Sequence, residues 1–130
     1  MAVPDCPLCA MVSGTTRVVV LRCWPDVIAV EAPSPRAPGH VLLIATDHFD
    51  DVAAAPHVAG VVMVAAAELA ADYPCCTILA TREEVRAGDE PPHLHLDLIP
   101  RAPSSEFVRT GAADSLASIR GSGPFSRRPG

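Results

Sequence analysis

The fold of this chain can be predicted from one segment, Pro92-His93-Leu94-His95-Leu96-Asp97-Leu98-Ile99-Pro100-Arg101. Its polar and aliphatic residues alternate, which is typical of a β-strand with one buried face. His93, His95 and Asp97 would then share one face, and the three leucines would point into a core. Histidine is the side chain suited to proton transfer at neutral pH and to metal binding. The segment therefore predicts a strand that presents a functional site. The alternative is a solvent-exposed polar face without chemistry.

The size and composition of the chain narrow the classes of function. Its 130 residues suffice for one domain, 49% of them are hydrophobic, and the formal net charge is -5. The chain has no lysine and no stripe of arginines, which argues against binding to nucleic acid. No apolar run reaches membrane-spanning length, and charge and cysteines interrupt the N-terminus too early for a signal peptide. We expect a cytoplasmic protein that acts on a small molecule and binds neither nucleic acid nor a membrane.

The pattern along the chain predicts one domain over residues 1–104 and a flexible tail over 105–130, where Ser, Gly, Arg and Pro dominate. A helix is expected from Asp50 or Asp51 to about Asp72, with an interruption at Pro56. The proline-rich stretch 32–39 and the charged stretch 82–92 are expected to be loops. Strands are expected over residues 17–22, 24–30, 40–45, 77–81 and 93–99.

The five cysteines are interpreted in two groups. Cys6-Pro7-Leu8-Cys9 is a CxxC motif, which suits a metal ion or a redox pair. Disulfides are rare in cytosolic proteins, so the other three cysteines are expected to be core residues without chemistry. They are Cys23, Cys75 and Cys76.

Three ordered segments resemble the histidine triad (HIT) family. They are Cys6-Pro-Leu-Cys-Ala-Met-Val-Ser-Gly14, then Ala37-Pro-Gly-His-Val-Leu-Leu-Ile44 followed by Asp47-His48-Phe49, and the signature-like segment 93–101. The resemblance covers roughly residues 4–101. It implies an α+β fold with an antiparallel sheet, one main helix and an N-terminus held by zinc, often assembled as a two-fold homodimer.

The resemblance also implies a structural Zn²⁺ ion. In zinc-bearing members the metal is held by the CxxC pair, the histidine after the central strand and the first histidine of the signature. The matching residues are Cys6, Cys9, His48 and His93. Two thiolates and two imidazoles form a closed tetrahedral site without an open position for substrate. The alternative is a pair of reduced thiols and a surface histidine.

The catalytic residue that the resemblance implies is His95. In the family the middle histidine attacks the phosphorus of a nucleotide ester, amidate or anhydride and forms a covalent nucleotidyl-histidine. Asp97 replaces the third histidine of the signature and would act with His95. His40 matches a histidine near the active site that orients the signature strand. The alternative for His40 is a hydrogen-bonded core histidine.

The departures from the family pattern gather around the reaction centre. Gly88, Asp89 and Glu90 stand where the family has Gly-Gln-Ser/Thr, so Asp89 and Glu90 are the expected substrate-binding positions. Ala32 replaces the acidic residue that holds the ribose hydroxyls. Two like charges about 5 Å apart repel by about 3 kcal/mol at an effective dielectric of about 20. Carboxylates near His95 therefore disfavour an ordinary nucleotide and hold the imidazole protonated to higher pH.

Three functional hypotheses follow. The first is a nucleotidyl hydrolase or transferase that forms a covalent intermediate on His95, with a phosphoramidate or adenylated small molecule as substrate. The second is an enzyme repurposed on the same scaffold, in which His95 and Asp97 act on a non-nucleotide molecule that bears an amine. The third is a non-catalytic binding protein that keeps only the structural zinc.

Overall fold

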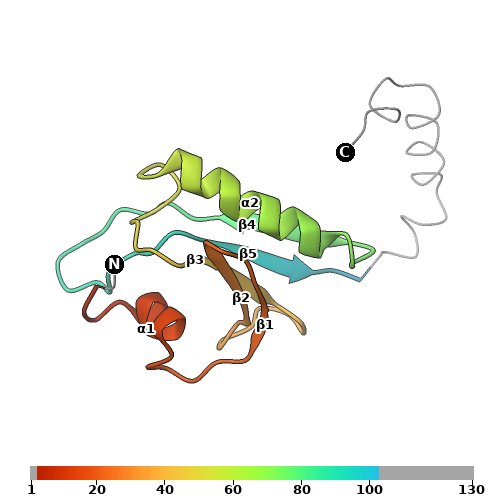
Figure 1. Ribbon diagram of the computed structural model, residues 1–130, viewed down its shortest axis with the longest axis horizontal. Coiled ribbons are helices and arrows are strands. Elements are labelled where there is room, and N and C mark those ends of the chain that lie inside the picture. The colour runs from red at the N-terminus through yellow and green to blue at the C-terminus, as the bar shows by residue number, and fades with distance from the viewer. Residues whose placement is uncertain (1–2, 103–130) are drawn as a thin grey trace.

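The structure is a computed structural model that describes residues 3–102, and it shows one antiparallel sheet between two helices (Figure 1). The strand order is β1-β2-β3-β5-β4. The helices are α1 (Pro7–Ser13) and α2 (Pro56–Ala70). The strands are β1 (Val20–Cys23), β2 (Val27–Glu31), β3 (Val41–Ala45), β4 (Cys76–Ala80) and β5 (His95–Pro100). The expected α+β class with an antiparallel sheet is confirmed.

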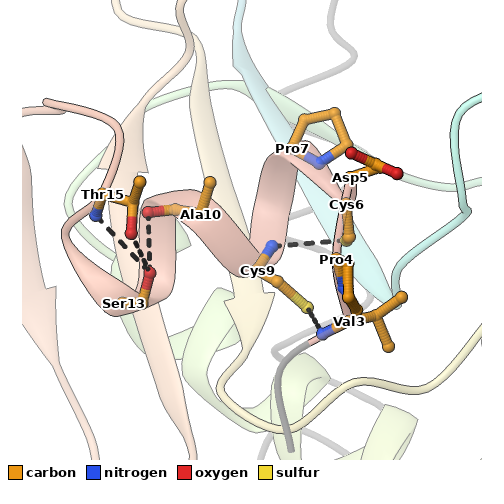
Figure 2. Close-up of a pocket in the computed structure, with 9 residues that line it drawn as sticks. All are labelled: Val3, Pro4, Asp5, Cys6, Pro7, Cys9, Ala10, Ser13 and Thr15. Atoms are coloured by element: carbon orange, nitrogen blue, oxygen red, sulfur yellow. Dashed lines mark hydrogen bonds between the residues drawn. The ribbon is translucent and has the colours of Figure 1, made fainter.

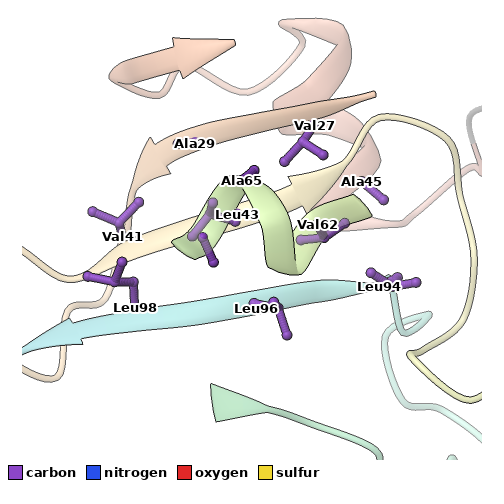
Figure 3. Packing of buried hydrophobic residues seen from close by; sticks show 11 residues of the cluster. Val27, Ala29, Val41, Leu43, Ala45, Val62, Ala65, Leu94, Leu96 and Leu98 are labelled. Atoms are coloured by element: carbon purple, nitrogen blue, oxygen red, sulfur yellow. The ribbon is translucent and has the colours of Figure 1, made fainter. Parts of the chain in front are cut away.

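The main core lies between the sheet and α2 (Figure 3). Leu94, Leu96 and Leu98 are all buried in it, together with Val62 and Ala65 of α2. The alternation of segment 93–99 thus has the predicted effect, with the leucines on the face that α2 covers. Among the described residues, neither helix has the length and apolarity that crossing a membrane requires.

The opposite face of the sheet carries a smaller apolar cluster and the candidate site. Leu8 and Met11 of α1 pack there against a buried cluster that includes Leu42 and Ile44 of β3. In the register of β3 with β5, Ile44 is opposite His95, and Leu42 is opposite Asp97. Residues directly opposite one another in a sheet share a face. The two polar residues therefore lie on the α1 side of the sheet, next to this cluster.

The position of α2 corrects one prediction. The helix begins at Pro56 with Ala55 as its N-cap, instead of at Asp50 or Asp51. Asp51 closes a separate turn, in which its Oδ1 accepts hydrogen bonds from the backbone N–H groups of Ala53 and Ala54, each at 2.9 Å. Proline starts the helix because its fixed φ suits the first turn, where no N–H donor is needed.

Four of the strands begin later than predicted, whereas β4 begins one residue earlier, at Cys76. The first two strands are shifted toward the C-terminus because residues 24–26 form the turn between them, with the Trp24 N–H bonded to the Val27 carbonyl at 2.8 Å. β5 begins at His95, so His93 precedes the strand that was expected to include it. The stretches 32–39 and 82–92 contain no helix or strand, as predicted. The predicted tail over 105–130 lies outside the described residues.

The core assignment of the remaining cysteines is wrong for two of the three. Cys23 and Cys75 are exposed, whereas Cys76 is half-buried and packs against the main core. Cys23 ends β1 and Cys75 precedes β4, and these are the two edge strands of the sheet. A side chain at the edge of a sheet lacks neighbours on one side, which the local sequence does not reveal.

Replacing Leu98 tests how much the core contributes to the free energy of unfolding. Leu98 is fully buried between Val41 and Ile78 of the adjacent strands. Leu98→Ala is expected to lower the free energy of unfolding by about 3 kcal/mol, because a buried cavity forms. The control Leu21→Ala, at a residue 47% exposed on β1, is expected to cost less than about 0.5 kcal/mol. Urea unfolding measures both, and equal losses would contradict this account of the core.

Candidate functional site

The structure brings together the four residues expected to bind metal. Cys6 and Cys9 come from the start of α1, His48 follows β3, and His93 precedes β5. One ligand atom from each lies within 4.8 Å of all the others. Residues 87 positions apart thus meet at one point, which ties the N-terminal segment to the signature strand.

The two cysteines converge because of how α1 begins. Cys6 is the N-cap, Pro7 follows at the first helical position, and the Cys9 N–H donates to the Cys6 Sγ at 3.3 Å (Figure 2). The Cys9 Sγ also accepts a hydrogen bond from the Val3 N–H at 3.3 Å. A cavity of about 470 Å³ borders this turn. Both thiols are nevertheless shielded, since Cys6 is 2% and Cys9 5% exposed.

The two imidazoles each have their Nδ1 close to the cysteine sulfurs. The Nε2 of His93 donates to the Ala45 carbonyl at 2.7 Å, and the Nε2 of His48 lies 3.4 Å from an Asp50 carboxylate oxygen. These partners place the ring hydrogens on Nε2 and leave each Nδ1 with a lone pair. The two Nδ1 atoms are only 3.2 Å apart. Converging lone pairs repel one another unless a cation lies between them.

The spacing of the ligand atoms fits zinc. Zn–S bonds of about 2.3 Å and Zn–N bonds of about 2.0–2.1 Å give tetrahedron edges of about 3.3–3.8 Å. The distance from the His93 Nδ1 is 3.4 Å to each sulfur, and the His48 Nδ1 lies 3.3 Å from the Cys9 Sγ. These three distances and the 3.2 Å between the two Nδ1 atoms agree with such edges to within a few tenths of an ångström, and the remaining pairs lie within 4.8 Å. The four residues therefore form a set that can hold Zn²⁺.

Burial affects the protonation of two of these ligands. It lowers the pKa of His93, which favours the neutral imidazole that binds metal. It raises the pKa of the Cys6 thiol, so the thiolate needs a nearby cation to be stable. Metal binding would release the Cys6 proton, and the site would lose affinity as the pH falls.

A second group of residues lies next to the first. The Nδ1 of His95 donates to the His93 carbonyl at 2.8 Å, and its Nε2 is 3.4 Å from the Oδ2 of Asp97. The Oδ1 of Asp97 accepts a hydrogen bond from the Nε2 of His40 at 2.8 Å. The three residues predicted to be catalytic are therefore linked through the Asp97 carboxylate, by a hydrogen bond to His40 and a longer contact with His95. His40 and Asp97 are buried, and His95 is partly exposed.

The carboxylate of Asp97 controls the charge on His95. The hydrogen bond to Asp97 raises the pKa of His95, and burial opposes this rise only in part. Burial also disfavours the ionised form of Asp97, but the hydrogen bonds to His95 and His40 outweigh it and the pKa of Asp97 is lowered. The pKa of His95 is thus raised, as predicted from the sequence, and the main cause is Asp97.

A strongly acidic cavity of about 370 Å³ adjoins His95. Its other lining residues are Asp50, Asp51, Thr81, Glu83, Glu84, Val85, Asp89, Glu90, Pro92 and His93. Six of them are carboxylates, and none is Lys or Arg. Such a lining disfavours anions and favours a cationic group.

The two predicted substrate-binding residues lie on this cavity but do not contact His95 through a hydrogen bond in the described structure. Asp89 is exposed, and its Oδ2 accepts a hydrogen bond from the Arg86 N–H at 2.8 Å within its own loop. Glu90 is exposed as well. Ala32 packs with the apolar cluster beside α1, so its position supplies no acceptor for ribose hydroxyls.

Sequence reasoning missed four of the carboxylates around this cavity. They are Asp50, Asp51, Glu83 and Glu84. The acidic pairs are visible in the sequence, but pairs of charges are common on solvated surfaces. Only the tertiary structure shows that two separate loops carry them to one cavity.

Comparisons with known proteins place this geometry in context. A family model described as HIT domain matches residues 15–104, which leaves the CxxC motif just outside the matched part. No curated protein matches the chain. Similar solved structures do exist, and they share the fold at low sequence identity.

Three solved structures illustrate this similarity. A histidine triad protein from Clostridium difficile is 21% identical, with a TM-score of 0.67, 82% of this chain covered and 100% of that chain. A HIT family protein from Bacillus anthracis is 25% identical, with a TM-score of 0.58 and coverages of 96% and 99%. A Zn-bound histidine triad family protein from Mycobacterium smegmatis is 23% identical, with a TM-score of 0.63, and 78% of each chain is covered.

Proposed function

This chain belongs to the HIT domain family, and from that premise we propose that it is a nucleotidyl hydrolase or transferase with His95 as its nucleophile. One observation carries the proposal. The Nδ1 of His95 is held by the His93 carbonyl at 2.8 Å, so the lone pair of the neutral ring is on Nε2, beside a cavity of about 370 Å³. An anchored imidazole whose second nitrogen has a lone pair at a cavity can act as a nucleophile. This Nε2 also lies 3.4 Å from the Oδ2 of Asp97.

The proposed reaction has two steps. The Nε2 of neutral His95 attacks the phosphorus of a nucleotide phosphoramidate, the P–N bond to the leaving amine breaks, and the amine takes up a proton from solvent. Water then attacks the phosphorus of the nucleotidyl-histidine. The bond to Nε2 breaks, the nucleoside monophosphate leaves with the oxygen of water, and neutral His95 is restored.

The acidic cavity supports a substrate with a cationic leaving group. Six carboxylates line the cavity next to His95. Three of them also contact a basic side chain: Asp50 with His48, Asp51 with Arg82, and Glu84 with Arg86. A positively charged amine placed among them gains electrostatic complementarity, whereas a second phosphate is repelled. We therefore favour the nucleotidyl amidate of a cationic amine over a dinucleotide as the substrate.

The zinc ion enters this proposal as a structural element. Cys6, Cys9, His48 and His93 would hold Zn²⁺ with all four coordination positions taken, and the ion would supply folding free energy rather than a reacting group. His93 would connect the two sites, because its side chain faces the metal position while its carbonyl holds His95. The Zn-bound relative from Mycobacterium smegmatis supports this assignment.

A second candidate function rests on the contact between His95 and Asp97. The raised pKa of His95 favours the imidazolium, which donates protons and is not a nucleophile. A repurposed enzyme would then use His95 as a general acid, or as a base oriented by Asp97, on an amine-bearing molecule that is not a nucleotide. This candidate predicts no covalent nucleotidyl adduct.

Intact-mass spectrometry after brief incubation with adenosine phosphoramidate, or with an adenylated diamine, separates the two candidates. The parent is expected to gain the mass of one adenylyl group, and His95→Ala is expected to gain none. His57→Ala, at an exposed histidine on α2, is the matched control and should behave as the parent does. No adduct and no nucleotide turnover in the parent would overturn the nucleotidyl proposal.

The pH dependence of turnover tests the influence of Asp97. A nucleophilic His95 must be neutral, and Asp97 raises its pKa above the ordinary value of 6.5. The value of kcat/KM is therefore expected to rise with pH through an apparent pKa above 6.5. In Asp97→Asn the carboxylate is lost, so this rising limb should move to lower pH.

The measurement is kcat/KM for the adenylated amine between about pH 5 and 9. Asp72→Asn is the control, because Asp72 is an exposed carboxylate that does not line the cavity beside His95. An unchanged limb in Asp97→Asn, or an equal shift in Asp72→Asn, would show that Asp97 does not set the charge on His95.

A further inference from the structure

His48 has a neighbour outside the set of candidate metal ligands. Its Nδ1 lies 3.3 Å from the Cys9 Sγ, whereas its Nε2 lies 3.4 Å from the Oδ1 of Asp50. The His48 side chain is only 12% exposed, and over residues 3–102 Asp50 is the one polar partner of this Nε2. The imidazole therefore lies between the metal position and a carboxylate.

The loop after β3 holds Asp50 in this place. The carbonyl of the preceding residue, Phe49, accepts a hydrogen bond from the Leu94 N–H at 2.7 Å, which ties this loop to the segment that enters β5. The carboxylate of the following residue, Asp51, closes the next turn with two backbone N–H groups as donors. The backbone of Asp50 is thus anchored on both sides, which keeps its carboxylate beside His48.

The same carboxylate also lines the acidic cavity beside His95. The Asp50 side chain is 68% exposed, so a molecule in the cavity can reach it. Of the six carboxylates around this cavity, Asp50 alone contacts a candidate metal ligand in the part of the chain that the structure describes. Asp50 is therefore the side chain that the metal centre and the cavity have in common.

A carboxylate behind a metal-binding imidazole affects the metal in two ways. It accepts the hydrogen on Nε2, which leaves Nδ1 bare for the metal, and its negative charge makes the imidazole a stronger ligand. Loss of such a partner typically lowers metal affinity by about 10–100-fold. We expect the lower end of this range, because Asp50 is mostly exposed and water screens its charge.

We propose that Asp50 couples the metal centre to the acidic cavity: its carboxylate supports His48 as a ligand of Zn²⁺, and a cation that binds this carboxylate from the cavity lowers the affinity of the centre for the metal. Two thiolates, two neutral imidazoles and Zn²⁺ carry no net charge together, so direct repulsion of the cation is small. By linkage, Zn²⁺ lowers the affinity for the cation by the same factor. The binding of a cation rests on the function proposed above, whereas the contact with His48 does not.

The zinc affinity of the full chain tests the support that Asp50 gives to His48. Competition with a chromophoric chelator at fixed pH measures this affinity without turnover. Asp50→Ala is expected to lower it by about tenfold. Asp50→Asn keeps an oxygen that accepts the Nε2–H of His48 and is expected to lower it less.

Glu83→Gln is the matched control for these variants. Glu83 is an exposed carboxylate of the same cavity, and it contacts no candidate metal ligand in the described residues. The variant removes the same charge from the cavity and is expected to keep the zinc affinity of the parent. An unchanged affinity in Asp50→Ala, an equal loss in Glu83→Gln, or a parent that binds no zinc would overturn the proposal.

The same titration with methylguanidinium tests the coupling. This cation is always charged and has no lone pair for zinc, so it does not compete for the metal. At constant ionic strength it is expected to lower the zinc affinity of the parent and of Glu83→Gln by up to about tenfold, which is the effect of losing the Asp50 partner. Asp50→Ala is expected to show no change. No effect on the parent, or the same effect in Asp50→Ala, would overturn the coupling.

These outcomes are separate from those that test the proposed function. A parent that shows the coupling and forms no nucleotidyl adduct would contradict the nucleotidyl chemistry and confirm the role of Asp50. A parent that forms the adduct, with a zinc affinity that is the same in Asp50→Ala, would overturn the role of Asp50 alone.

Discussion

His95→Ala is expected to lower kcat/KM for the adenylated amine by about 10⁴-fold or more, since removal of a nucleophile leaves only the contribution of binding. The loss should fall on kcat, because the variant keeps the acidic cavity that would hold the leaving amine. Steady-state kinetics on the zinc-loaded protein measure the effect. His57→Ala is expected to keep the parent's kcat/KM.

The structural cost of His95→Ala is expected to be small. The lost side-chain contacts are the hydrogen bond to the His93 carbonyl and the longer contact with Asp97. Hydrogen bonds of this kind contribute about 1 kcal/mol each. Metal content and cooperative unfolding should therefore be retained. If the inactive variant has also lost its zinc, the loss of activity results from a change in folding. If the variant is active, His95 is not the nucleophile.

Cys6→Ser is expected to remove most of the bound zinc and to destabilise the domain by an amount on the order of 5 kcal/mol. Structural zinc contributes about 10–16 kcal/mol of apparent binding free energy in small domains, and a ligand set with one member missing retains only part of it. A domain of this size is stable by about 5–15 kcal/mol in total. Much of the variant is therefore expected to be unfolded at ordinary temperature.

Metal analysis together with thermal unfolding tests this expectation. The parent should carry one zinc ion per chain, and treatment with a chelator should reproduce the loss of stability seen in Cys6→Ser. Cys23→Ser is the matched control, because Cys23 is an exposed cysteine on β1. If both serine variants unfold at the temperature of the parent, zinc is not part of what stabilises this fold.

The antiparallel fold could be predicted from the sequence because local periodicity reports burial. Leu94, Leu96 and Leu98 alternate with polar residues, and all three are in the core. The boundaries of the elements were less accurate. Asp51 has the chemistry of a helix cap, yet it closes a turn, because Pro56 starts α2 five residues later. Local capping chemistry does not reveal which of two nearby starts a helix uses.

The two clusters of the site differ in how far sequence alone could predict them. The resemblance to the family identified the candidate metal ligands before the structure showed that they converge. They are Cys6, Cys9, His48 and His93. The order of contacts around His95 depends on atoms that the sequence leaves unplaced. That Asp97 has one oxygen toward His40 and the other toward His95 follows from the packing of β3 against β5.

The sequence by itself thus determined the alternation of the signature strand and the carboxylate at position 97, which are properties of residue identity and short-range spacing. The candidate metal ligands were identified through the family resemblance. Only the tertiary structure decided that two acidic loops share a cavity beside His95 and that Asp97 lies between His40 and His95. These features depend on where separate segments meet in space, and that is determined by the packing of the whole sheet against α1 and α2.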